Sequence, residues 1–423
     1  MNSTASAELH ATVQAKTGPV ELGVAHGLAI KAYSRFDDVV GMWEKLQLHN
    51  SGSPFQLAGF VSACLSAIPA VARDTGQRQQ PLFIVCYSGL EPVAIYALAI
   101  ERSLAGRRLA WFADRLCDYN GPVVARHFSH SIPGNLLDAI IGLIQKKYTG
   151  IDYAYLIRNL KGHPTIPDAG LNNLTAIPAE HSAHALQLQR NWPELYQNLR
   201  SKETRRRFRG KYTALAKLAS LRFGQIRNDA RRQASASQVM DWKSAQLLEA
   251  GDRNPFGSAT APSQLRSTIL ECLQRKDSGL KLFCLEMDGR PLAGILGLVS
   301  GGNFSLWVTA YDPAFGNKYS AGTLLLIKTL ELASRAGLAH FDFLMGDEPY
   351  KKDWCNIKIP LYHVMQPLTT KGRVCCSVIQ AGLNVKKFIL SRPAAMKSIR
   401  YARKAVLRQK SAARPEPAGA FSA

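Results

Sequence analysis

The pattern of hydrophobic and polar positions occurs twice along the chain, with a spacing of about 200 residues between the copies. Apolar runs at 82–87 and 93–100, joined by Ser88-Gly89, predict a β-hairpin. Runs at 282–286 and 292–299, joined by Asp288-Gly289, predict a second one. A third strand follows each hairpin, at 109–112 and at 303–311, and then a helix and a short strand. This order predicts two mixed α/β domains of one type, each with a mostly antiparallel sheet flanked by helices.

The helix of the second copy is the most informative segment. It is predicted to begin at about Thr323, after a loop of small residues at 317–322, and to end at Gly337. Free N–H groups in the first turn, together with the helix dipole, favour a phosphate group at such a place. A tight turn into a packing helix is the alternative. The first copy has His130 to Asn135 here, without the same pattern, so we expect the phosphate site in the second half alone.

This strand, turn, helix and strand resemble the acyl-CoA-binding core of the GNAT acetyltransferases. In that family a Q/R-x-x-G-x-G/A motif wraps the CoA pyrophosphate, and its six positions correspond here to residues 317–322. Asn317 replaces Gln or Arg, and Ser320 replaces the first Gly. The resemblance implies that the phosphates contact Asn317, Lys318, Ser320, Ala321, Gly322 and Thr323.

A longer pattern, Y-D-P…S-x-G-x-L-L…G…F-D-F-L-x-G-D-x-x-Y-K…W, spans residues 311–354. It resembles the CelD/BcsL-type acetyltransferase-like family, which is related to the FemAB peptidyl transferases and associated with exopolysaccharide biosynthesis. The resemblance implies tandem GNAT-like domains and acetyl-CoA or a longer acyl-CoA as co-substrate, with no permanently bound cofactor. It also implies a saccharide or envelope precursor as the acceptor.

Acyl transfer from a thioester needs a base for the acceptor and an acid for the departing sulfur. Asp342 and Asp347 are the candidate bases, Tyr350 is a candidate acid, and Lys351 is a candidate for positioning the acceptor or a CoA phosphate. The alternative is structural, with Asp342 capping a loop and Tyr350 and Lys351 closing the domain.

The net charge of +22 is concentrated in two segments. Residues 200–232 hold 12 Lys and Arg against 2 Asp and Glu, and residues 371–423 hold 12 against 1. A helix at 191–219 places Arg205, Arg206 and Arg209 where they can contact an acceptor or polyanion, and Tyr311 is assigned to the same set. A solvated basic face is the alternative. A helix at 394–408 would suit anionic lipid headgroups, and a disordered tail is the alternative there.

Several classes of protein find no support in the chain. It has no C-x-x-C pair, so we expect no structural metal, and no G-x-S-x-G, H-E-x-x-H or P-loop motif. The N-terminus lacks the pattern of a signal peptide, and no apolar run reaches the roughly 18 residues of a membrane span. We therefore expect a cytoplasmic protein whose basic tail can lie at the inner face of the membrane.

The predicted division is a leader at 1–28, domains at 29–190 and 191–370, and a basic tail at 371–423. An acyltransferase acting on an amine or a hydroxyl is the leading hypothesis. One alternative is a FemAB-like transferase that uses aminoacyl-tRNA, although a single helix at 235–249 stands where many FemAB proteins have a long helical hairpin. The other is a non-catalytic GNAT scaffold that binds nucleic acid or a membrane.

Overall fold

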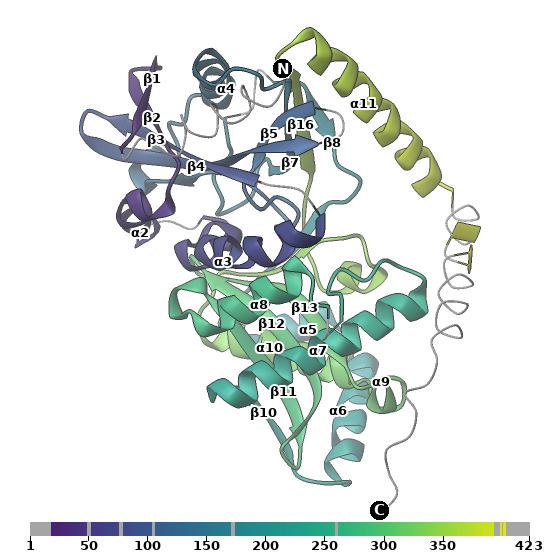
Figure 1. Cartoon of the computed structure of the whole chain (residues 1–423). Helices are drawn as coiled ribbons and strands as arrows, with labels where there is room; N and C mark the ends of the chain where they lie inside the picture. Colours follow the sequence, from purple (N-terminus) through teal and green to yellow (C-terminus); the bar gives the residue numbers. More distant parts are fainter. Residues whose placement is uncertain are drawn as a thin grey trace, which may run out of the picture.

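Two β-sheets form the framework of the molecule, with helices between and outside them (Figure 1). The structure, a computed structural model, describes residues 18–48, 52–75, 79–103, 106–170, 174–258, 261–392, 398–399 and 401–402. We call the first sheet with its helices the first half, and the second sheet with its helices the second half. The mixed α/β class with mostly antiparallel sheets is confirmed.

The strands of the first sheet follow the order β1-β2-β3-β4-β5-β7-β16-β8, and β6 pairs with β4 beside this path. Among them only β5 and β7 pair in parallel. Their bounds are β1 Val20–Ala25, β2 Leu28–Tyr33, β3 Gln79–Ser88, β4 Glu91–Ser103, β5 Gly106–Trp111, β6 Val123–Val124, β7 Tyr153–Leu160, β8 Ala176–Pro178 and β16 Leu361–Pro367.

The second sheet has the order β10-β11-β12-β13-β14-β9-β15, with β13 and β14 as its parallel pair. Both predicted hairpins are therefore present, and each is followed by the predicted third strand and, after the helix, by the predicted short strand, which pairs in parallel with the third strand. The bounds are β9 Ala183–Gln187, β10 Leu221–Gln225, β11 Leu280–Met287, β12 Arg290–Ser300, β13 Asn303–Tyr311, β14 His340–Met345 and β15 Ile357–Ile359.

The two sheets exchange strands. β9 lies before the predicted boundary at residue 190, yet it pairs with β14 in the second sheet. β16 lies near the end of the predicted second domain, yet it pairs with β7 in the first sheet. Each parallel strand thus obtains an antiparallel neighbour from across the predicted boundary. The division at residue 190 stays a prediction, but the pairing of the strands does not follow it.

The helices complete the layers. In the first half they are α2 Val40–Leu48, α3 Ala58–Thr75 and α4 Leu136–Lys147, and in the second half α5 Trp192–Leu199, α6 Lys202–Ala216, α7 Asp229–Ala250, α8 Gln264–Gln274, α9 Pro313–Tyr319 and α10 Ala321–Arg335. The long α11, Thr370–Leu390, follows β16. Short 3₁₀ turns lie at Phe36–Asp38, Pro54–Gln56, Arg126–Phe128, Lys276–Ser278 and Pro349–Asp353. None of the helices that the structure describes is long and apolar enough to cross a bilayer.

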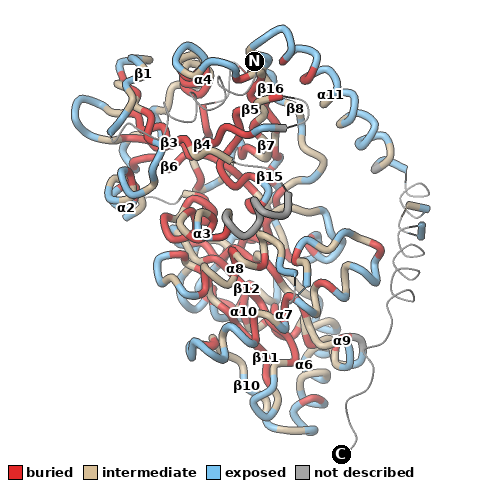
Figure 2. Tube along the Cα trace, viewed as in Figure 1, coloured by how far each residue is buried: buried red, intermediate tan, exposed pale blue. Residues whose placement is uncertain are grey.

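Three hydrophobic cores hold these layers together, and Figure 2 shows their buried residues in red. α4 packs on the outer face of the first sheet. α2, α3, α7 and α8 fill the space between the sheets, where α3 and α8 contact each other. α5 and α10 pack on the other face of the second sheet. The two halves therefore share the middle core.

The structure differs from the sequence predictions in three helical or terminal segments. The expected leader includes residues 20–28, but β1 pairs there with β2. The expected single helix at 191–219 is broken at Arg200, because Ser201 caps a new helix by accepting a hydrogen bond from the Thr204 N–H. The helix expected at 235–249 begins earlier, at Asp229, and a second helix, α8, follows it. Most of the helix expected at 394–408 lies outside the described residues.

Candidate functional site

α9 and α10 meet at Ser320, the centre of the predicted phosphate loop. Ser320 adopts the left-handed conformation with φ 55° and ψ 43°. The open loop expected over 317–322 is wrong at its start, because Asn317 and Lys318 lie in the last turn of α9. Asp312 caps that helix by accepting a hydrogen bond from the Ala314 N–H at 2.9 Å, and proline follows at the first helical position.

The first turn of α10 supplies hydrogen-bond donors. Among the described residues, the backbone N–H groups of Ala321, Gly322 and Thr323 have no acceptor, while the Leu324 N–H bonds to the Ser320 carbonyl. The Lys211 Nζ of α6 donates to the Ser320 Oγ at 2.6 Å. Three N–H groups, a helix dipole and an ammonium therefore converge where an anion would bind. Lys211 was missed as a site residue, although it lies in the basic segment.

Tyr311 fixes the angle between the two helices. A Cβ at Gly322 would lie 2.6 Å from its Cδ1, and a Cβ at Gly316 would lie 2.1 Å from its Cε2. The ring therefore packs directly on both glycines, which explains why small residues stand at these two positions. The role of Tyr311 as an acceptor contact stays a prediction, since this packing occupies both sides of the ring.

β13 and β14 stop pairing partway along their length. Their register runs from Asn303 opposite His340 to Ser305 opposite Asp342, although both strands continue beyond that point. After Asp342 the pairing of β14 with β9 also shifts, and Leu344 has a φ of 61°. A leucine in the left-handed region is strained, so the end of β14 is held in this shape by its contacts.

Asp342 lies where the pairing stops, and it is 2% exposed. The Tyr119 hydroxyl donates to its Oδ2, and the Leu344 N–H donates to its Oδ1 at 2.8 Å. Tyr119 belongs to the first half, so this hydrogen bond joins the two halves. Phe341 and Phe343 belong to the core on the opposite face of β14, and sequence reasoning did not find Tyr119.

His163 approaches the same carboxylate from the first half. Its Nδ1 accepts hydrogen bonds from the N–H groups of Thr165 and Ile166, each at 3.1 Å, so the ring proton lies on Nε2. That Nε2 lies 3.8 Å from the Asp342 Oδ2 and has no hydrogen-bond partner among the described residues. A buried donor without a partner is costly, so His163 is a candidate for a role at this site.

Asp118 is the second carboxylate of this cluster. Burial raises its pKa to about 6, and the negative charge of Asp342 adds to the rise, while Arg158 and Lys351 oppose it. It also accepts a hydrogen bond from the backbone of Met345, at the end of β14. The cluster thus holds one carboxyl group that changes charge close to neutral pH.

The buried ammonium of Lys351 is hydrogen-bonded to the backbone at the end of β14. The residue is 2% exposed, and its Nζ donates to the carbonyls of Leu344 at 3.2 Å and Met345 at 2.9 Å. The same ammonium lies 3.0 Å from the Glu348 carboxylate. These contacts favour a positioning role, and its predicted contact with an acceptor or CoA phosphate stays a prediction.

Comparison with models of known protein families gives a match within the second half. Residues 202–352 match the model of the acetyltransferase (GNAT) domain. The second half is therefore similar to a GNAT acetyltransferase domain over these residues. The match includes Lys211, the turn at Ser320 and the Asp342 strand, so the anion site and the buried carboxylate belong to one domain.

Similarity to the solved structure of FemX supports the fold alone, and two further structures align at lower TM-scores. FemX aligns with 79% of this chain and 95% of its own at 12% identity, with a TM-score of 0.50. A conserved protein of unknown function from Bacteroides thetaiotaomicron aligns with 77% of this chain and 97% of its own, at 12% identity and a TM-score of 0.47. A tandem GNAT protein from the clavulanic acid biosynthesis pathway aligns with 80% and 99%, at 12% identity and 0.40. No curated protein matches the sequence.

Asp347, the alternative base, has different partners from Asp342. Its carboxylate contacts the His184 Nε2 at 2.9 Å and the His181 Nδ1 at 3.1 Å, and its side chain is 40% exposed. Burial raises its pKa, but the hydrogen bonds from the two histidines outweigh burial, so the pKa lies below its usual value. A carboxylate held in its charged form is a weaker base than one with a raised pKa.

Tyr350, the candidate acid, lies beside the end of β14. Its ring contacts Phe343 edge to face at 6.2 Å between centroids, and the residue is 36% exposed. Burial raises the pKa of its hydroxyl above the ordinary value, with Glu348 adding to the rise. The hydroxyl therefore keeps its proton at neutral pH, as an acid must.

The arginines of α6 lie on the side of the GNAT domain where α6 contacts α9. Arg206 and Arg209 are exposed, while Arg205 is half-buried and its Nε has no hydrogen-bond partner among the described residues. Arg200 behaves differently, since it stacks on the Trp354 ring at 4.0 Å and pairs with Asp353 at 3.5 Å. The three predicted arginines thus lie on the helix that carries Lys211, and their contact with an acceptor or polyanion stays a prediction.

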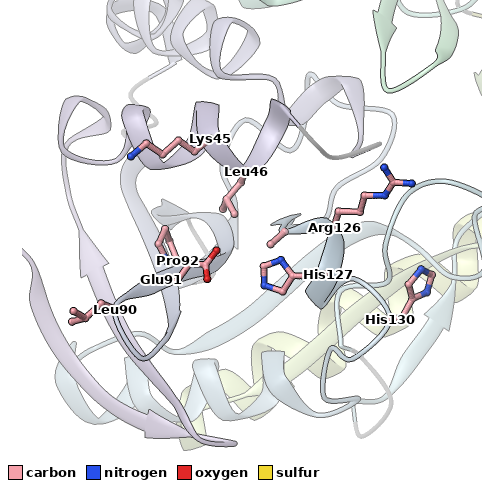
Figure 3. A pocket seen from close by; sticks show the side chains of 9 residues that line it. Lys45, Leu46, Leu90, Glu91, Pro92, Arg126, His127 and His130 are labelled. Atoms are coloured by element: carbon pink, nitrogen blue, oxygen red, sulfur yellow. The ribbon is translucent and has the colours of Figure 1, made fainter.

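A pocket of about 1000 Å³ lies in the first half, between α2, the start of β4 and the turn after β6 (Figure 3). Glu91 and His127 face each other within it, and Lys45 and Arg126 extend to opposite sides. His130 completes its charged or titratable lining, and all five of these residues are exposed. The charged or titratable side chains that line this pocket are all exposed, whereas the side chains of Asp342 and of its partners Tyr119 and His163 are buried. We therefore do not assign the reaction to this pocket.

Proposed function

We propose that the protein transfers an acetyl or longer acyl group from acyl-CoA to an amine or hydroxyl of a sugar or of a cell-envelope or exopolysaccharide precursor. The observation that carries the proposal is the first turn of α10, with three N–H groups that have no acceptor among the described residues and with the Lys211 ammonium. This turn packs on Tyr311, at the end of the part of β13 that no longer pairs with β14. Because acyl-CoA is an intracellular metabolite, the proposal places the reaction in the cytoplasm.

The donor would bind in two parts. The pyrophosphate would lie on the N–H groups of Ala321 to Thr323 and on Lys211. The pantetheine arm is extended and carries two amides. It can hydrogen-bond to strand backbone that has lost its neighbour beyond Ser305 and Asp342. The thioester would then lie close to the buried carboxylates.

The carboxylates of Asp118 and Asp342 would take the acceptor's proton as a coupled pair. The nitrogen or oxygen of the acceptor forms a bond to the thioester carbonyl carbon, and the bond from that carbon to sulfur breaks. The thiolate leaves and receives a proton, for which Tyr350 is the candidate. Tyr119 and His163 would orient Asp342, because one donates to its Oδ2 and the other points at it.

The acceptor would enter between the two halves, since Asp118, Tyr119 and His163 all come from the first half. A saccharide with phosphate or carboxylate groups would find cations at Arg206 and Arg209. The same exposed arginines of α6 favour the second candidate, a FemAB-like transferase that uses aminoacyl-tRNA, because an RNA backbone would follow a basic helix.

The first experiment is titration calorimetry with acetyl-CoA and longer acyl-CoAs. We expect one site per chain, and we expect Lys211→Ala to weaken binding by about five- to tenfold through loss of one charged hydrogen bond. Lys217→Ala, an exposed lysine at the end of the same helix, is the matched control and should change binding less than twofold.

Chromatographic detection of free CoA would then test amino sugars and saccharide hydroxyls as acceptors. Failure of every acyl-CoA to bind would refute the proposal. Tight binding of aminoacyl-tRNA together with that failure would support the second candidate. Binding of acyl-CoA that Lys211→Ala leaves unchanged would place the donor elsewhere.

A further inference from the structure

α11 has two apolar faces, of which one is used within the molecule. Cys375 and Cys376 are buried against Tyr153 and, with Ile379, attach the helix to β7 and β16. Figure 1 shows α11 along one side of the first half, and Figure 2 shows its outer surface exposed along most of its length. After Ile379 none of the described side chains of the helix is buried.

The outer face carries a stripe of large apolar side chains. Val374, Val378, Val385 and Phe388 are 63%, 66%, 59% and 56% exposed. Their spacings of four, seven and three residues place them on one line along the helix. Scattered exposed apolar residues are ordinary, but four on one face of a single helix indicate a contact surface.

The charges around this stripe have one sign. α11 contains Lys371, Arg373, Lys386 and Lys387 and no acidic residue. Lys371 pairs with Asp152 and Lys386 with Glu180, which leaves Arg373 and Lys387 without an ion pair among the described residues. At the end of the stripe, the guanidinium of Arg392 lies over the Phe388 ring, 4.1 Å from its centre.

Charge decides between the surfaces that could cover the stripe. A second α11 has the same positive charge, and residues 393–423 of the same chain are also basic, so both would repel it. An anionic lipid surface offers both things that the helix presents, an apolar layer for valine and phenylalanine and negative headgroups for lysine and arginine.

We propose that α11 binds the surface of a bilayer that contains anionic phospholipid, with Val374, Val378, Val385 and Phe388 at the boundary between headgroups and acyl chains. The helix lies on the membrane and does not cross it. This binding holds the first half against the lipid surface, and it goes beyond the proposed acyl transfer, on which it does not depend.

The test is co-sedimentation of the full chain with vesicles of phosphatidylcholine alone or with about 30% phosphatidylglycerol. We expect binding to the anionic vesicles that weakens as salt rises, and at least about tenfold weaker binding to the neutral ones. Val378→Asp with Phe388→Asp should reduce binding at least about tenfold, because two apolar side chains leave the membrane and two negative charges face it.

Leu90→Asp is the matched control. Leu90 is 98% exposed at the β3–β4 turn, so the same change of charge is made outside α11, and we expect binding to change less than twofold. An equal loss in Leu90→Asp and in the α11 variant would overturn the proposal, as would absence of binding to anionic vesicles. Light scattering that shows a dimer lost in the α11 variant would assign the stripe to a second copy and overturn it as well. Unchanged thermal midpoints would show that the variants fold.

Discussion

The two halves of the molecule share one arrangement of strands but differ where their parallel strands stop pairing. In the first half, β5 and β7 pair at Arg108 and Leu109, and beyond this point the gap is closed. The Trp111 Nε1 donates to the Asn159 Oδ1 at 2.8 Å, and Asn120 forms an isolated bridge with Asn159. In the second half no such bridge joins β13 and β14 among the described residues.

The helices that follow these strands, α4 and α10, also differ in whether the N–H groups of their first turns are hydrogen-bonded. At the start of α4, the Leu136 N–H bonds to the Pro133 carbonyl and the Leu137 N–H bonds to the Gly170 carbonyl. At the start of α10 the corresponding donors have no partner among the described residues. The first half therefore satisfies internally the groups that the second half leaves for a ligand. A shared fold does not imply two active sites.

A single loop connects the two places. Asn120 closes the first half through its bridge to Asn159. The adjacent Tyr119 donates to the carboxylate of Asp342 in the second half, and Asp118 accepts a hydrogen bond from the Met345 backbone at the end of the same strand. The closed half thus serves as a rigid support for side chains that act in the other half. Rigid support of this kind is what a site with two nearby carboxylates requires.

The largest expected effect separates the two candidate bases. Asp342→Asn keeps the size of the side chain but removes its charge, and we expect acyl transfer to fall by about 10²- to 10⁴-fold. Acetyl-CoA affinity should change less than about threefold, since the phosphate contacts are elsewhere. Asp347→Asn is the control, and transfer should stay within about threefold because His181 and His184 occupy that carboxylate. The opposite order would assign the base to Asp347.

The second prediction tests whether the closed gap between β5 and β7 prevents the first half from binding acetyl-CoA. Trp111 is fully buried, so Trp111→Ala removes its indole from the core and leaves the Asn159 oxygen without its donor. We expect a loss of about 3–5 kcal/mol in the free energy of unfolding, measured with urea. Calorimetry at a temperature where the variant is folded should still give one acetyl-CoA site with unchanged affinity. A second acetyl-CoA site in the variant would show that the closed gap between β5 and β7 is all that prevents the first half from binding acetyl-CoA.

Local patterns were sufficient to predict the strands and the helix of each half. Alternation and glycine turns act over a few residues, so both hairpins, β13 and α10 were found close to their observed bounds. The roles that the pattern from Tyr311 to Trp354 gave to Ser320 and Asp342 stay predictions. The prediction failed in the loop before α10. There Asp312 caps the helix α9, which includes Asn317, where the sequence predicted a loop.

Contacts between distant parts of the chain were beyond this reasoning. Tyr119 and Asp342 are separated by 223 residues, and no spacing rule joins them. His163 lies in a segment with prolines on both sides of Thr165, which has no period to interpret. The exchange of β9 and β16 was equally hidden, because short apolar runs do not indicate which sheet they join.

The last prediction concerns the charge of Asp118. Its pKa in the folded protein is about 6, above the 3.8 of an ordinary aspartate, so the folded protein holds this proton more tightly than the unfolded chain does. The unfolded chain therefore binds fewer protons between about pH 4 and pH 6, and stability falls as pH rises through this window. Asp118→Asn removes the effect. We expect equal stability of variant and wild type near pH 4 and a gain of at most about 3 kcal/mol for the variant at pH 8.

Urea unfolding at the two pH values measures this difference, and Asp37→Asn, an exposed aspartate of the first half, is the control. The variant would then be more stable than the wild type at pH 8 and would also lose acyl transfer. This combination would mean that Asp118 lowers the stability of the protein but supplies a base that ionises near neutral pH. No gain would show that Arg158 and Lys351 fully compensate the buried charge. In that case the first half supports Asp342 through Tyr119 and His163 without supplying a base of its own.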